Sequence, residues 1–165
     1  MALSRRHFLA GLTAAALSGC GFHLRGSFTL PFESLYIDLP NNSKFGALLT
    51  RYLRSGSNVT VVKSLGEAQA ILKIVSDTTT SDVLSYNASG RAREYELKRT
   101  LTFKVTDAQG YEFVSPSTLT VARAMTYDES DYSSRSGEEE TIRDEMQNDI
   151  AVLMIRRIEK AKPKK

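Results

Sequence analysis

A long run of alternating residues between Tyr95 and Val105 constrains the fold more than any other feature. Its odd-numbered positions are apolar, with Arg99 as the exception, and its even-numbered positions are charged or hydroxyl residues. Asp107-Ala108-Gln109-Gly110 predicts a turn, after which the same alternation returns in Phe113, Leu119, Val121, Met125 and Tyr127. We therefore expect a long antiparallel hairpin with one apolar face. Solvation explains its polar face, although contact with the wet lumen of a partner would give the same pattern.

The chain before this hairpin predicts one helix among shorter strands. Leu35 to Leu39 alternates like a strand and stops at Pro40. Asn42 or Ser43 then caps a helix that ends at Gly56. Its apolar residues lie on one face: Phe45, Leu48, Leu49, Tyr52 and Leu53. Two further extended pieces follow, one with Val59 and Val61 and one over residues 70–75, with Gly66 and Glu67 at the turn between them.

A second helix is predicted at the end of the chain. Ser136-Gly137-Glu138-Glu139 fits a capping box, and Pro163 ends the helix. Its apolar stripe is Ile142, Met146, Ile150, Leu153, Met154 and Ile158. The order of elements predicts a single α+β domain. We expect a mostly antiparallel sheet of four strands, or slightly more, with two amphipathic helices packed on one face.

The N-terminal residues are typical of an export signal. Arg5 and Arg6 precede an apolar run from Phe8 to Leu17, which is too short to cross a membrane. Leu17-Ser18-Gly19-Cys20 resembles the bacterial lipobox, so we expect cleavage before Cys20 and S-diacylglycerol and N-acyl lipid on that residue. Residues 4–9 also resemble a twin-arginine motif, which leaves the general and twin-arginine export routes both open.

These expectations divide the chain into four parts. Residues 1–19 are a cleaved signal peptide, 20–33 a lipidated tether, 34–162 the globular domain and 163–165 a short basic tail. The mature chain has 165 − 19 = 146 residues, enough for one domain. Loss of Arg5 and Arg6 lowers the formal charge from +3 to +1, so the composition does not favour nucleic acid as a partner.

Residues that carry enzyme chemistry are scarce. His23 is the one histidine of the mature chain and Cys20 its one cysteine, so a His/Cys metal site is not expected. The chain has no G-x-S-x-G elbow and no glycine-rich phosphate loop. Asp128, Glu129 and Asp131 lack the spacing of a calcium loop and predict a solvated or partner-contacting loop. We expect the protein to catalyse no reaction and to carry no metal and no cofactor beyond the covalent lipid.

Three arginines are candidates for an anionic ligand. Arg91 and Arg93 follow a turn marked by Gly90, and Arg135 lies in the Ser/Gly-rich loop expected before the last helix. Guanidinium groups bind phosphate through a planar fork, and arginines on loops can converge on one anion. Dispersed surface charge that aids solubility is the alternative interpretation.

The residues that follow the lipid cysteine resemble a known family. Cys20-Gly21-Phe22-His23-Leu24-Arg25-Gly26 is similar to the opening of the lipopolysaccharide-assembly lipoproteins, LptE. Glu94-Tyr95 after a glycine turn, and Ile142 and Glu145-Met146 on the last helix, also resemble that family. The resemblance implies an outer-membrane lipoprotein, lipid-anchored on the periplasmic side, with Gly21 as part of the sorting signal.

The same resemblance implies a task and partners. Such a protein assists assembly of the LptD β-barrel, plugs its lumen as a 1:1 complex, and binds lipopolysaccharide during its transport to the outer leaflet. Arg91, Arg93 and Arg135 then become candidates for contact with the phosphates of lipopolysaccharide. The alternative is an outer-membrane lipoprotein that binds a small molecule or a cell-wall glycan, which predicts a monomer with a concave apolar pocket.

Overall fold

The computed structural model describes residues 28–126 and 132–163. The signal peptide, Cys20, the carboxylates of residues 128–131 and the end of the basic tail therefore lie outside the described residues. Within these, the strands are β1 (Ser34–Asp38), β2 (Thr60–Val62), β3 (Ala70–Tyr86), β4 (Ala92–Thr106) and β5 (Glu112–Thr126). The α-helices are α2 (Lys44–Gly56) and α3 (Tyr132–Glu159), and η1 (Leu65–Glu67) is a short 3-10 helix.

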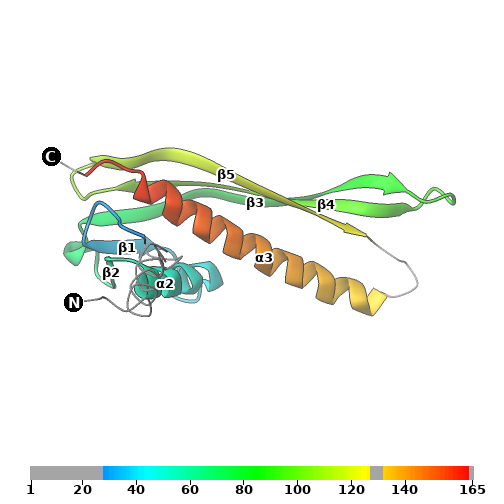
Figure 1. Ribbon diagram of the computed structural model, residues 1–165, viewed down its shortest axis with the longest axis horizontal. Coiled ribbons are helices and arrows are strands. Elements are labelled where there is room, and N and C mark those ends of the chain that lie inside the picture. Colours follow the sequence, from blue (N-terminus) through cyan, green and yellow to red (C-terminus); the bar gives the residue numbers. More distant parts are fainter. Residues whose placement is uncertain (1–27, 127–131, 164–165) are drawn as a thin grey trace, which may run out of the picture.

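The strands form a single sheet in the order β2-β1-β3-β4-β5. β3, β4 and β5 are antiparallel neighbours, whereas β1 runs parallel to both β2 and β3. β1 and β2 are parallel because α2 carries the chain back before β2 begins, and the segment with η1 returns it again before β3. Both helices lie on one face of this sheet, α2 beside β1 and β2 and α3 along the long strands (Figure 1). The predicted α+β class, with a mostly antiparallel sheet and two helices, is confirmed.

Helix α2 forms as predicted. Ser43 is the N-cap, and its hydroxyl accepts a hydrogen bond from the amide of Gly46 at 3.1 Å. Phe45, Leu48, Leu49 and Leu53 are buried against the sheet. The helix ends at Gly56, where the hydroxyl of Ser57 donates to the carbonyl of Leu53 at 2.7 Å. Ser57 thus satisfies a carbonyl that the end of the helix leaves without an intrahelical partner.

Strand β3 is far longer than the sequence predicted. Its first residues are apolar, but Ser76 to Asp82 are polar and exposed, so no hydrophobic alternation marks them as a strand. They are held extended by pairing with β4, which continues to Tyr86 opposite Ala92. Because backbone hydrogen bonds rather than buried side chains define this half of β3, the apolar pattern underestimates its length.

Helix α3 begins at Tyr132, so the capping box predicted at Ser136 is wrong. Ser136 to Glu139 lie inside the helix, and Arg135 is in its first turn rather than in a preceding loop. The predicted stripe is also wrong at Leu153, which is 39% exposed, while Ile155 is buried. Met146, Ile150, Met154 and Ile158 recur every fourth residue, and Ala151 and Ile155 extend the same face.

The folded part begins before residue 34. Leu30 and Phe32 are 3% and 4% exposed and belong to the same core as β1 and α2. Leu30 is fixed by Asn58, whose side-chain oxygen accepts from its amide at 2.9 Å. The segment that the sequence assigned to the tether thus contributes two core side chains.

Candidate functional site

The turn between β3 and β4 forms a hydrogen-bonded tip at one end of the long hairpin. The side-chain oxygen of Asn87 accepts from the amides of Ser89 and Arg91 at 2.9 and 3.0 Å. The amide of Asn87 also donates to the carbonyl of Arg91 at 2.7 Å. Gly90 has φ +75°, a conformation that other residues adopt at a cost. Arg91 therefore leaves the turn in a defined direction.

Apolar and cationic side chains lie close together around this turn. Val83, Leu84 and Tyr86 are 39%, 53% and 66% exposed at the end of β3. Arg91 and Arg93 are exposed at the start of the neighbouring strand, where Tyr86 pairs with Ala92. We call these five residues the tip patch. The sequence pattern indicated its arginines but not its apolar members; Val83 and Leu84, which directly follow a hydroxyl-rich run, are the signal that could have indicated them.

The third candidate arginine approaches the same end of the molecule. Arg135 lies in the first turn of α3. Figure 1 shows that α3 begins at the end of the molecule toward which the β3–β4 turn points. The direction of the Arg135 side chain lies outside the described part of the structure. The fold thus brings the three backbone segments to one end, where the tip patch also lies.

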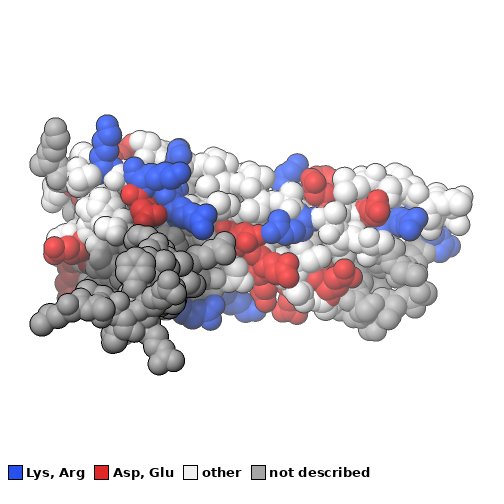
Figure 2. Space-filling model, in the orientation of Figure 1, with Lys and Arg blue, Asp and Glu red and all other residues white. Residues whose placement is uncertain are grey.

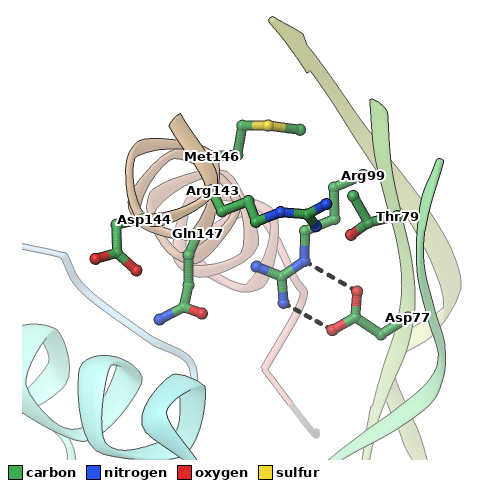
Figure 3. A pocket seen from close by; sticks show the side chains of 7 residues that line it. All are labelled: Asp77, Thr79, Arg99, Arg143, Asp144, Met146 and Gln147. Atoms are coloured by element: carbon green, nitrogen blue, oxygen red, sulfur yellow. Dashed lines mark hydrogen bonds and ion pairs between the residues drawn. The ribbon is translucent and has the colours of Figure 1, made fainter. Parts of the chain in front are cut away.

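A cleft opens between β3, β4 and α3 on the helix-covered face of the sheet (Figure 3). Its volume is about 300 Å³, and Asp77, Thr79, Arg99 and Arg143 line it. Arg99 donates to both carboxylate oxygens of Asp77, from Nε at 2.9 Å and from Nη2 at 2.7 Å. Arg143 is bound to Glu139 one helical turn away, at 2.6 and 3.0 Å. Because both guanidinium groups are engaged by carboxylates, the cleft is not arranged to hold an anion.

Arg99 is the exception in the predicted alternation, and the structure explains why. Its side chain is 11% exposed on the face that also carries Leu97 and Leu101. Its guanidinium carbon lies 5.0 Å from the centre of the Phe45 ring of α2. A paired cation over an aromatic ring can be buried at low cost. Arg99 therefore joins sheet and helix and is structural.

The opposite face of the long strands is polar and carries no helix of the described chain (Figure 1). Threonines from neighbouring strands meet there: the hydroxyls of Thr102 and Thr118 are 2.9 Å apart and those of Thr100 and Thr120 are 3.4 Å apart. Charges on the same face are of mixed sign, with Lys98 3.9 Å from Glu96. We call this surface the threonine face. It suits contact with water or with a polar partner surface.

Two kinds of site are not found among the described residues. No group of three or more His, Cys, Asp or Glu side chains in this part of the chain is placed to hold a metal ion. Neither described helix combines the length and the apolar character needed to cross a membrane.

A further open cavity of about 580 Å³ lies between β1, α2 and β2, with Tyr36, Leu39 and Val61 beside Arg54 and Lys63.

Comparison with protein families gives a match over most of the chain. The model of the LptE family, described as lipopolysaccharide-assembly, matches residues 32–158. The LPS-assembly lipoprotein LptE of Pectobacterium atrosepticum is 29% identical over 152 residues, which cover 90% of this chain and 81% of that protein. The protein of the same name from Photorhabdus laumondii is 27% identical, over 91% of this chain and 82% of its own length.

Solved structures with the same fold are also lipoproteins by name. The solution structure of lipoprotein B from Nitrosomonas europaea superposes with a TM-score of 0.69 at 31% identity and covers 82% of this chain and 88% of its own. The crystal structure of a minor lipoprotein from Acinetobacter baumannii gives a TM-score of 0.64 at 25% identity, covering 78% and 91%.

Proposed function

The chain belongs to the LptE family of lipopolysaccharide-assembly proteins, and on this premise we propose that it acts as an outer-membrane lipoprotein in complex with the β-barrel LptD. It assists assembly of that barrel, plugs its lumen, and binds lipopolysaccharide on the way to the outer leaflet. The family match over residues 32–158 is the observation that carries the proposal. In this role the protein acts by binding and catalyses no reaction.

The membrane attachment in this proposal is the lipid on Cys20. That residue follows a lipobox-like sequence and is the only cysteine of the chain. A diacylglyceryl group together with an N-acyl chain attaches a protein to the membrane more strongly than one acyl chain, which alone gives marginal attachment. The mature protein should carry the mass of both lipids, and Cys20→Ala should remove it.

The chemistry of the threonine face supports the proposed position of the domain inside the lumen of the barrel. The lumen of a large membrane barrel is polar and filled with water. A surface of hydroxyl groups and oppositely charged pairs can form hydrogen bonds to such a wall without burying an unpaired charge. β3, β4 and β5, which have 17, 15 and 15 residues, extend this surface along α3, and the β3–β4 turn reaches beyond the start of that helix (Figure 1).

The tip patch supports the contact with lipopolysaccharide. That molecule is amphipathic, with phosphates beside acyl chains. Arg91 and Arg93 offer forks for phosphate, while Leu84 and Tyr86 offer exposed apolar surface beside them. The backbone of Arg135 lies in the first turn of α3. We propose that the three arginines hold the phosphates and that the apolar members contact the acyl region.

Co-purification tests the partner. The protein isolated from membranes in mild detergent should bring down a large barrel at equal stoichiometry. A monomer with no barrel partner that binds a small molecule or a cell-wall glycan would contradict the proposal and favour the alternative.

A triple charge reversal tests the ligand. Arg91→Glu, Arg93→Glu and Arg135→Glu together should weaken binding of lipopolysaccharide while the barrel still co-purifies. Reversal of Lys44, Arg51 and Lys63, which are exposed around α2 and β2, is the matched control. Unchanged binding by the tip variant would remove the three arginines from the site.

A further inference from the structure

The chain enters the fold where both helices end. The amide of Phe28 donates to the carbonyl of Gly56, the last residue of α2, at 2.6 Å. The amide of Thr29 donates to the carboxylate of Glu159, the last residue of α3, at 3.2 Å. Leu30 follows directly into the core. The position of residue 28 is therefore tied to this end of the molecule, which we call the anchor end.

The distance from the lipid cysteine to the anchor end is short. Cys20 and Phe28 are 28 − 20 = 8 residues apart in the chain. An extended chain reaches at most about 3.6 Å per residue, so this connection spans no more than about 29 Å. A lipid on Cys20 consequently keeps the anchor end near the headgroups of its leaflet. The connection limits the distance but leaves the orientation of the domain open.

Exposed cations gather at the anchor end. Arg156 and Arg157 lie in the last turn of α3, and Lys160 and Lys162 follow it; all four are exposed. No ion pair between described residues involves any of them. The one carboxylate among them, Glu159, accepts from Thr29. Blue side chains over the last turns of α3 show this concentration in Figure 2.

We propose that these four residues, the basic end, bind anionic phospholipid headgroups in the leaflet that holds the lipid on Cys20. The inference rests on the lipidation in the proposed function. A helix C-terminus favours cations through its dipole, which accounts for Arg156 and Arg157 in part but not for Lys162 beyond the helix. Clusters of basic residues beside a membrane anchor are attracted to anionic lipid, and the attraction fades within a Debye length. The short connection from Cys20 keeps the basic end within reach of the surface.

Binding at the basic end would orient the whole protein. β3 starts at the anchor end and its 17 residues lead to the tip patch. At about 3.3 Å per residue, β3 is roughly 55 Å long, so the tip patch lies far from the basic end. The two groups of cations therefore cannot bind one headgroup. The basic end faces the headgroups of the anchoring leaflet, and the tip patch lies at the opposite end of the domain.

Site-specific labels measure this orientation on the mature, lipidated protein. Because Cys20 is the only cysteine and its thiol is acylated, an introduced cysteine is the single free thiol. Ser55→Cys marks the last turn of α2 at the anchor end, and Ser89→Cys marks the tip turn. Each labelled protein is inserted into vesicles with nitroxide headgroup lipids, either phosphatidylglycerol with phosphatidylethanolamine or phosphatidylcholine alone.

We expect strong quenching at position 55 and weak quenching at position 89 in the anionic vesicles. Phosphatidylcholine, or about 1 M salt, should weaken this contrast to the level that the connection from Cys20 gives by itself. Reversal of all four cations to Glu should weaken it to the same level, whereas reversal of Lys44, Arg51, Lys63 and Arg143, which are exposed away from the last turn of α3, should leave it intact. An equal contrast in the two kinds of vesicle, or a contrast unchanged by reversal of the basic end, overturns the proposal. So does a contrast that appears with lipopolysaccharide but not with phosphatidylglycerol.

Failure of the lipidation itself is distinguishable. The protein would then lack the lipid mass and remain in solution with every vesicle, which overturns this inference together with the anchoring role of Cys20. A lipidated protein without the contrast overturns the inference alone.

Discussion

Arg99 donates two parallel hydrogen bonds to Asp77, at 2.9 and 2.7 Å, on the side of the sheet that carries the hydrophobic core. The pair sits where β3 changes from apolar to polar residues. Ile74, before it, packs against the core, while the residues that follow it on β3 are exposed. The pair therefore marks where β3 leaves the core, whereas Leu97 of β4 and Met125 of β5 are still buried beyond it toward the tip.

Removal of one member of this pair should lower the free energy of unfolding, because the other member is then left without its partner. Asp77→Ala leaves the guanidinium of Arg99, which is 11% exposed, without its carboxylate and should lower the free energy of unfolding by about 1–3 kcal/mol. The double variant Asp77→Ala, Arg99→Leu should recover part of that loss, because no cation without a carboxylate partner is then left in the cleft. Urea denaturation measures both. A double variant less stable than Asp77→Ala would contradict the interpretation.

The face of α3 that packs on the sheet can be tested with two aliphatic side chains. Ile150 is fully buried, whereas Leu153 is 39% exposed. Ile150→Ala should cost about 2–5 kcal/mol of unfolding free energy. Leu153→Ala should cost less, because more than a third of this residue is already exposed to water. Equal losses of unfolding free energy in the two variants, measured with denaturant, would support the apolar stripe predicted from the sequence.

Two glycines should respond to alanine with opposite signs. Gly110 has φ +91° in the turn between β4 and β5, so Gly110→Ala should destabilise the protein by about 1–2 kcal/mol. Gly137 lies within α3, and a methyl group there meets no atom within 4 Å. Gly137→Ala should stabilise the helix by up to about 1 kcal/mol. Thermal unfolding of the two variants gives the comparison, and shifts of the same sign would refute it.

The turns at the two ends of β4 share one construction, which gives a fourth test. Asp107 accepts from the amides of Gln109 and Tyr111 at 2.9 and 2.8 Å, just as Asn87 accepts from Ser89 and Arg91. Asp107 is only 7% exposed, whereas Asn87 is exposed. Asp107→Ala should therefore cost about 1–3 kcal/mol, and Asn87→Ala clearly less, since water replaces its bonds. Hydrogen exchange of the four amides locates the loss.

Local patterns predicted much of the fold. Alternation over 95–105, the turn at Asp107 to Gly110 and the cap at Ser43 all appear in the structure. These features depend on neighbours close in the sequence, so a single chain reveals them. The start of α3 was misplaced because Ser136 followed by glutamates has the pattern of a helix N-cap, although the same residues also occur inside helices. The far half of β3 was missed because it has no buried face.

The candidate site also contains some residues that the sequence indicated and others that only the fold brought to it. Arg91 and Arg93 were found because a turn glycine precedes them, while Leu84 and Tyr86 joined them only once β3 was seen to extend to the tip. The basic end also depends on the fold, since Arg156 and Lys160 acquire a role only when residue 28 is placed beside the end of α3.

By itself the sequence determined the class of the protein: the motif from Cys20 to Gly26, the α+β order of elements and the alternation of the long hairpin all follow from adjacent residues. Tertiary structure alone decided where these parts meet. It paired Arg99 with Asp77, buried Leu30 and Phe32, and placed the anchor end and the tip patch at opposite ends of β3. Such relations depend on contacts between residues 22 to 130 positions apart, and no local pattern encodes them.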